Sequence, residues 1–188
     1  APGATAMHLI GEFNNWDRTS HPMKAVGDGN WEIVIPGVRT LRHRSKVKVA
    51  VTSARGTEDR IPLYATYVVQ DEKTHNFSAA IWNPRKEFQW TDGKFRPKKN
   101  VPPLIYEAHV GMATEEERVG TYLEFMRDIM PRIKKDGYNT VQLMAVMEHP
   151  YYASFGYQVS NFFAASSWYG TPDDLKALIN EAHAMGLS

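Results

Sequence analysis

The chain has 188 residues, enough for one large domain or two small ones that each bury a core. Its 22 basic and 21 acidic side chains leave a net charge of +1, so net charge gives no reason to expect binding to nucleic acid or membranes. The absence of cysteine excludes disulfides and thiolate chemistry within the chain. The sequence contains no apolar run of about 18 residues and no basic, apolar leader, so we expect a cytoplasmic protein.

Residues 7–88 have the pattern of a small antiparallel β domain. Short apolar runs recur between turn residues such as Asn14 and Asn15, and residues 46–51 alternate in polarity as a half-exposed strand does. We predict a β-sandwich of about five to seven strands, forming a domain at residues 1–88. The predicted strands are residues 7–10, 31–35, 46–52, 67–69 and 79–82.

Residues 89–103 differ in composition from the preceding domain. They contain several prolines and basic residues, and each proline fixes its own φ and restricts the residue before it. We predict a stiff linker here. Residues 96–99 and 39–48 form two basic clusters, which we expect to be solvated surfaces, with contact to an anion as the alternative.

From residue 104 onward the pattern is strand, helix, strand, helix. Residues 104–110 and 138–146 are the predicted strands, and residues 121–135 and 171–185 are the predicted helices. Pro131 should kink or restart the first helix, because proline donates no backbone hydrogen bond. The second helix should begin at Thr171 as its N-cap, with Asp174 completing a capping box.

An unusually aromatic loop, residues 151–165, lies between the second strand and the second helix. In α/β folds, loops at the carboxyl ends of the strands hold the ligand. Aromatic faces without surrounding charge suit the apolar faces of sugar rings. We therefore predict that this loop faces carbohydrate.

At these residues the chain closely resembles the glycogen and starch branching enzymes of the α-amylase superfamily. The resemblance rests on Gly-Glu-Phe-Asn-Asn-Trp at residues 11–16, on residues 105–112 and 143–149, and on the loop through to residue 172. It implies a multidomain fold: an N-terminal β-sandwich like a glycogen-binding module, then the first two βα units of a (β/α)₈ barrel at residues 104–188. Because such a barrel needs about 250 residues, we expect the barrel to be incomplete and the chain to be the front part of a larger enzyme.

The resemblance also implies the binding residues. Tyr157, in Gly-Tyr-Gln at residues 156–158, would stack on the sugar before the scissile bond, with Gln158 contacting a hydroxyl. In the N-terminal domain, Trp16 and the turn residues Asp28, Gly29 and Asn30 would contact a glucan chain. The alternative for Tyr157 and Trp16 is that each ring packs into a core, as most aromatic side chains do.

Glycoside chemistry needs two carboxylates, and Glu107 and Glu148 lie near the carboxyl ends of predicted strands. The family resemblance instead places the catalytic carboxylates on later strands, so we predict no catalytic residue in this chain and assign Glu107 and Glu148 to shaping the barrel mouth. His109 and His149 lack zinc-binding spacing, and we predict no metal and no cofactor.

The sequence thus predicts a branching enzyme that cleaves an α-1,4-glucan and rejoins the segment through an α-1,6 bond. Its partners would be glycogen, amylose or amylopectin, and the 188-residue chain alone should be inactive. The alternatives are a debranching hydrolase of the same superfamily and a non-catalytic glucan-binding or scaffold protein. The sequence predicts no oligomeric state.

Overall fold

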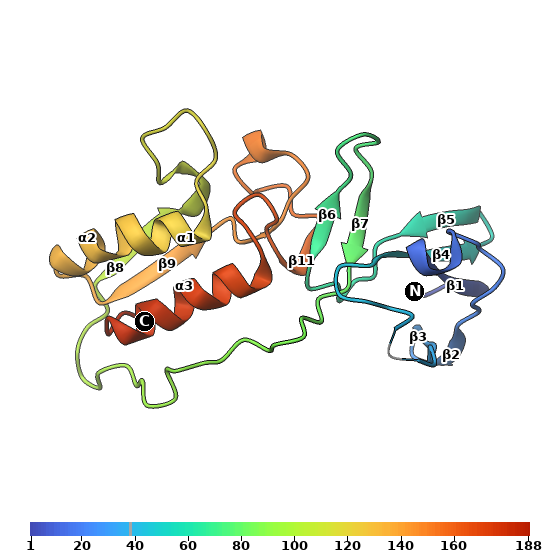
Figure 1. Ribbon diagram of the computed structural model, residues 1–188, viewed down its shortest axis with the longest axis horizontal. Coiled ribbons are helices and arrows are strands. Elements are labelled where there is room, and N and C mark those ends of the chain that lie inside the picture. Colours follow the sequence, from blue (N-terminus) through green and yellow to red (C-terminus); the bar gives the residue numbers. More distant parts are fainter. Residues whose placement is uncertain (38) are drawn as a thin grey trace. The chain divides into compact units, whose positions relative to one another are not determined.

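The computed structural model describes residues 1–37 and 39–188. The chain divides into two compact units, Ala1–Arg85 and Lys86–Ser188 (Figure 1). The segment 89–103, expected to be a linker, therefore belongs to the second unit.

The first unit is built on a five-stranded antiparallel sheet. Its longest strand is β4 (Lys46–Ser53), which pairs with β1 (Ala6–Gly11) along one edge. Along the other edge β4 pairs with β5 (Gly56–Arg60) and β7 (Phe77–Ala80), and β6 (Val68–Gln70) lies outside β7. The predicted alternation holds for residues 46–49 of β4: Val47 and Val49 are buried, and Lys46 and Lys48 lie on the opposite face. It ends at Ala50, which is buried although it lies on the same face as the lysines.

A separate hairpin completes the first unit. It consists of β2 (Lys24–Gly27) and β3 (Asn30–Glu32), joined by Asp28 and Gly29, which both have positive φ. Positive φ at both residues gives a two-residue turn a backbone twist that matches the twist of the two strands it joins. The strand predicted at residues 31–35 is too long, because the ladder ends at Glu32 and Val34 is 87% exposed. The short helical turn η1 (Glu12–Asn14) follows β1.

The second unit contains a parallel pair, β8 (Ile105–His109) and β9 (Thr140–Met144), covered by helices. The connection carries η2 (Val110–Met112), α1 (Tyr122–Glu124), η3 (Phe125–Ile129) and α2 (Met130–Lys135). After β9 come β10 (Met147–Glu148), η4 (Tyr152–Ser154), β11 (Asn161–Ala165) and α3 (Pro172–Ala184). The core consists mainly of buried side chains from the helices and the segments around them: Val110, Tyr122, Phe125, Met130, Ile133, Tyr169, Leu178 and Leu187.

The predicted break at Pro131 is confirmed. The turn before it, η3, is π-helical, and the Met130 amide donates to the Phe125 carbonyl, five residues earlier. Proline has no amide hydrogen, and its ring crowds the carbonyl four residues back in a regular α-helix. The wider turn relieves this crowding, and Pro131 then lies in the first turn of α2, where proline is tolerated.

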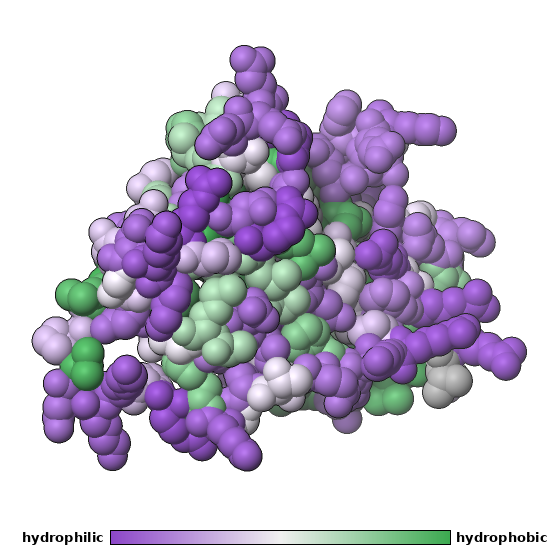
Figure 2. Space-filling model, turned by 60° about the vertical axis from the view of Figure 1, so that its left-hand side comes forward, coloured by the Kyte–Doolittle hydropathy of each residue, from purple (hydrophilic) through white to green (hydrophobic). Residues whose placement is uncertain are grey.

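Figure 2 shows hydrophilic side chains over most of the face it presents, with apolar side chains gathered in patches between them. None of the helices in residues 1–37 and 39–188 is long and apolar enough to cross a bilayer.

The N-cap of α3 gives a stability prediction. The Thr171 hydroxyl accepts from the Asp174 amide, and the Asp174 carboxylate accepts from the Thr171 amide at 2.8 Å. We expect Thr171→Ala to lower the free energy of unfolding by about 1 kcal/mol, because a first-turn amide loses its acceptor. Thr171→Ser keeps the hydroxyl and should stay near wild type in urea unfolding. Equal losses in both variants would contradict a capping role.

Candidate functional sites

The aromatic loop of the second unit is closed at its base by Glu148. β10 and β11 pair antiparallel, which brings the two ends of the loop together. The Glu148 carboxylate accepts hydrogen bonds from the Ser167 amide at 2.7 Å and the Ser167 hydroxyl at 3.2 Å. Its main-chain carbonyl accepts from the amide and the hydroxyl of Ser160. One residue therefore holds both the start and the end of β11.

This carboxylate is fully buried, which changes its acidity. Burial raises the pKa of Glu148 to about 7, although the hydrogen bonds from Ser167 oppose the shift. A carboxylate loses its hydration on burial, so its charged form is disfavoured. Because Glu148 is buried and bonded to Ser167, it acts as a structural clamp on the loop.

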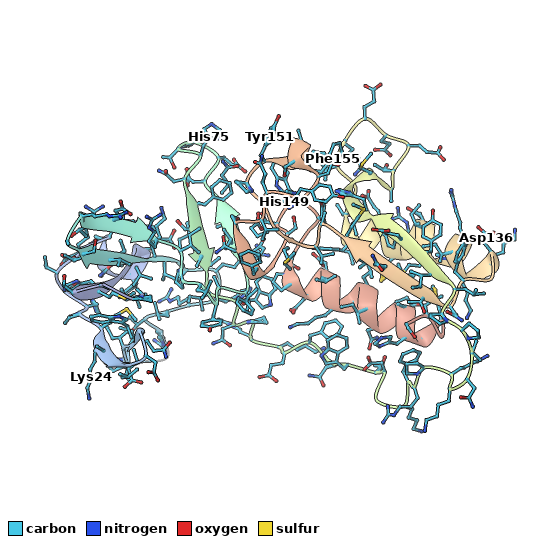
Figure 3. All side chains as sticks on the ribbon, turned by 180° about the vertical axis from the view of Figure 1, so that it is seen from behind. Lys24, His75, Asp136, His149, Tyr151 and Phe155 are labelled. Carbon is cyan, nitrogen blue, oxygen red and sulfur yellow. The ribbon has the colours of Figure 1, made fainter. Side chains whose placement is uncertain are left out.

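Two histidines lie beside the clamp. The His149 ring is buried, donates through Nδ1 to the Met147 carbonyl, and leaves Nε2 without a partner in the structure. The Trp168 indole donates to the His149 carbonyl at 2.8 Å. His109, at the end of β8, lies 3.3 Å from the Tyr169 hydroxyl through Nε2, and burial lowers its pKa. Both imidazoles lie against the Tyr169 ring, with centroid distances of 5.7 Å for His109 and 5.9 Å for His149. Figure 3 shows His149 close to the loop that carries Tyr151 and Phe155.

The exposed residue Tyr157 follows a glycine, Gly156, whose backbone lies very close to Ala145. Phe155 and Gly156 both have positive φ, and a Cβ added to Gly156 would lie 2.4 Å from Ala145 Cβ. Only glycine fits this approach without displacing the backbone. The Tyr157 ring is 80% exposed and Gln158 is also exposed, so neither packs into the core.

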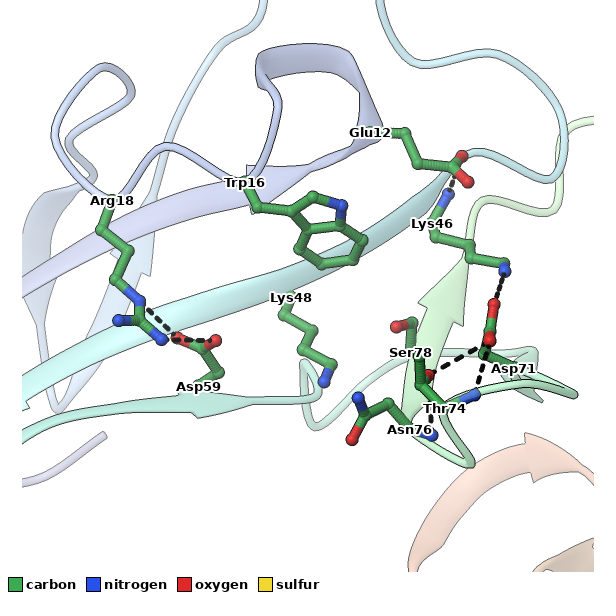
Figure 4. Close-up of a pocket in the computed structure, with 10 residues that line it drawn as sticks. All are labelled: Glu12, Trp16, Arg18, Lys46, Lys48, Asp59, Asp71, Thr74, Asn76 and Ser78. Carbon is green, nitrogen blue, oxygen red and sulfur yellow. Dashed lines mark hydrogen bonds and ion pairs between the residues drawn. The ribbon is translucent and has the colours of Figure 1, made fainter.

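In the first unit, Trp16 lines a cleft of about 620 Å³ on the face of the sheet. The indole is 38% exposed and lies beside Lys48, between two ion pairs (Figure 4). Arg18 pairs with Asp59 on one side, and Lys46 pairs with Asp71 at 3.0 Å on the other. In the described part of the chain, Lys48 takes part in no ion pair. An aromatic face flanked by polar groups is suited to stacking on a sugar ring.

The position of Trp16 depends on Asn14. The Asn14 side chain accepts from the Gly11 amide at 2.9 Å and donates to the Leu9 carbonyl at 3.2 Å. Asn15 and Trp16 then both take positive φ, an unusual conformation for a residue as bulky as tryptophan. Such strain persists only where the surroundings impose it, and it concentrates at functional sites.

The polar wall of the cleft is held by Asp71. Its carboxylate accepts from the backbone amides of Thr74 and Lys73 and from the Lys46 ammonium. These hydrogen bonds hold the pKa of Asp71 well below its usual range, and the bond from the Thr74 amide has the largest effect. The turn that carries Thr74 and Asn76 is therefore fixed beside the indole.

The structure separates the other predicted residues from these sites. Asp28, Gly29 and Asn30 do not line the Trp16 cleft, and the atoms nearest to a Cβ at Gly29 belong to Pro2. Glu107 is exposed on β8, whereas Glu148 is buried after β9. Across residues 1–37 and 39–188, no three His, Asp or Glu side chains come together in a way that could hold a metal ion.

Comparisons with known proteins identify relatives of both units. Residues 1–65 match carbohydrate-binding module 48, the isoamylase N-terminal domain. Over all of its length the chain is 51% identical to the 1,4-alpha-glucan-branching enzyme of Rhizophagus irregularis. It is 46% identical to the 1,4-alpha-glucan-branching enzyme 2-2, chloroplastic/amyloplastic, of Arabidopsis thaliana. Over its whole length the chain is therefore similar to a part of these branching enzymes.

The chain covers only part of these relatives. It spans 28% of the length of the Rhizophagus protein and 24% of the Arabidopsis protein. Among solved structures it matches the pullulanase from Bacillus acidopullulyticus with a TM-score of 0.76 at 22% identity, covering all of this chain and 26% of that chain. At this identity the match shows a shared fold and nothing more.

Sequence reasoning missed the residues that surround Trp16. Lys48, Thr74 and Asn76 line the cleft because β1 and β7 both pair with β4, which brings distant segments together. Of these, only Lys48 carried a signal, since it lies on the exposed side of an alternating strand. The bond between Glu148 and Ser167, which are 19 residues apart, had no signal in the sequence.

The buried carboxyl predicts a pH dependence of stability. Because the native pKa of Glu148 is about 7 and its ordinary value is 4.5, the native state keeps a proton that the unfolded state loses. Its contribution to the free energy of unfolding is therefore greatest below about pH 4.5 and falls as the pH rises to about 7. Glu148→Gln should abolish this fall. Between pH 4.5 and pH 8 the wild type should therefore lose about 3 kcal/mol more of its free energy of unfolding than the variant.

Urea unfolding of both proteins at pH 4.5 and pH 8 measures this difference. The matched control is Glu107→Gln, which removes one negative charge from an exposed side chain of the same unit. We expect only Glu148→Gln to flatten the dependence on pH. The assignment fails if the control flattens it equally.

Proposed function

We propose that the protein carrying this chain is a 1,4-α-glucan branching enzyme. It cleaves an α-1,4-linked glucan, holds the cut segment, and rejoins it through an α-1,6 bond. The observation that carries this proposal is the identity of 46–51% over the whole chain with proteins named as branching enzymes. The match to pullulanase structures, at 20–22% identity, supports only a common fold. The proposed location is the cytoplasm.

The first unit is proposed to hold the glucan chain. The match to carbohydrate-binding module 48 supports this role, and the Trp16 cleft offers the chemistry for it. The indole would stack on a glucose ring, while Lys48 and Asn76 would reach its hydroxyls. Glycogen, amylose and amylopectin are the proposed substrates.

The second unit is proposed to be the first two βα units of a (β/α)₈ barrel. Its parallel strands β8 and β9, with helices after each, support this. The second edge of β9 is also engaged: the Val141 amide donates to the Ser188 carbonyl at 2.8 Å, and the Ser188 amide donates to the Asn139 carbonyl. The catalytic carboxylates are proposed to lie on further strands, so this chain alone would bind glucan without branching it.

In this scheme the aromatic loop orients the substrate. Tyr157 is proposed to stack on the sugar before the scissile bond, with Gln158 at a neighbouring hydroxyl, because both side chains are exposed beyond the clamped base of the loop. A stacked ring holds the sugar in the reactive pose without transferring a proton.

Glucan binding by the first unit is tested with Trp16→Ala. We expect the variant to bind amylose about fivefold more weakly in affinity electrophoresis, because the stacking platform is lost. Trp90→Ala is the matched control, since Trp90 is an exposed tryptophan of the second unit. If both variants lose affinity equally, or neither does, the Trp16 cleft is not the binding site.

The role of Tyr157 is tested in the longer protein that contains the remaining strands. Tyr157→Ala should lower kcat/KM for branching at least about tenfold, and Tyr157→Phe should keep most of it, because the ring and not the hydroxyl stacks on the sugar. Tyr151→Ala, which removes another exposed ring of the same loop, is the control. A large loss in the Phe variant would argue against stacking and for a role of the hydroxyl.

A further inference from the structure

The second unit contains another cleft, of about 830 Å³, which the proposed glucan chemistry does not use. It lies between the segment 94–104 and the loop that leads into β9. We call it the basic cleft. Its lining includes four cationic side chains, contributed by two separate parts of the chain: Lys94, Arg96, Lys98 and Lys134.

The charges of the basic cleft are not balanced by acidic side chains. Among its described lining residues there is no Asp or Glu, and none of the four cations forms an ion pair. Other cations of the same unit do pair: Arg118 with Glu124, for example, and Lys176 with Asp173. Several cations around one concave surface raise the local positive potential and attract anions.

The segment that carries three of these cations is fixed in place at both ends. On one side, Phe95 stacks on His183 of α3 with ring centroids 4.2 Å apart, and Asp92 bonds to the same His183 ring. On the other side, Asn139 donates to the Pro102 carbonyl at 2.9 Å and accepts from the Leu104 amide at 2.8 Å. The cleft is therefore formed before any ligand arrives, which lowers the entropic cost of binding.

Arg96 is also held. Its guanidinium donates to the carbonyls of Gly93 and Phe95, so its charge stays next to the cleft although no acid binds it. Lys134 approaches from α2, with its ammonium 3.6 Å from the position that a Cβ on Gly186 would take. Tyr138, Val101 and Leu104 supply an apolar wall beside these charges.

We propose that the basic cleft binds a small phosphate ester, such as a sugar phosphate. A phosphate group carries a charge of about −1.5 to −2 near neutral pH and three strong acceptor oxygens, which matches the four cationic side chains of the cleft. Arginine and lysine both bind phosphate, the first through its planar fork and the second as a point charge. The organic part of the ester lies against the apolar wall.

The test is a titration of the 188-residue chain with glucose 6-phosphate, inorganic phosphate and glucose, followed by backbone amide NMR shifts. We expect glucose 6-phosphate to shift the amides of Gly137, Asn139 and Gly186, which line the cleft, and glucose to leave them unchanged. Lys98→Ala and Lys134→Ala should each weaken binding by about three- to tenfold.

The matched controls are Lys99→Ala and Lys135→Ala, the sequence neighbours that do not line the cleft. Both should change the affinity less than about twofold, because only long-range charge is lost. Equal weakening by lining and control variants, or no shift at the three amides, would overturn the proposal in favour of diffuse surface charge. Equal affinity for inorganic phosphate and glucose 6-phosphate would overturn the assignment of an ester.

Discussion

The conformation of the aromatic loop, residues 151–165, depends on one buried carboxylate at its base. Glu148 is buried, and two donors of Ser167 take the place of its hydration. Burial disfavours the charged form of Glu148, and the hydrogen bonds from Ser167 offset part of this cost, so the closed base of the loop is most stable while the carboxyl group keeps its proton. β10 follows β9 closely in the chain, so the same contacts connect the parallel strand pair to the exposed rings of the loop.

The two exposed aromatic platforms are positioned by different means. Trp16 is set by an unfavourable backbone conformation that the Asn14 side chain imposes. Tyr157 follows a glycine whose missing side chain allows the backbone to rest on Ala145. In both cases a polar or small residue nearby fixes the ring, so the stacking surface exists before substrate binds.

Local signals predicted a large part of the fold. The helix α3 was readable from its Thr171 cap and its apolar spacing, and β4 from its alternation. β5 was missed because all of its residues are exposed and polar or glycine, which leaves no apolar pattern. The Trp16 cleft was only partly readable, because it is assembled by strand pairing between distant segments, and register cannot be read from composition. The segment 89–103 was expected to be a linker between two domains. In the structure it also contacts α3, because Phe95 stacks on His183 and Asp92 bonds to the same ring.

The π-helical turn at Phe125–Ile129 has a consequence for how this helix can vary among related proteins. The turn holds one residue more than an α-helical turn would, and that extra residue relieves the crowding caused by Pro131. Deleting one residue there would restore the regular helix but also the clash, while replacing the proline alone would leave an unneeded bulge. The insertion and the proline are therefore an epistatic pair: a lineage is expected to carry both or neither, and intermediates with only one should be less stable.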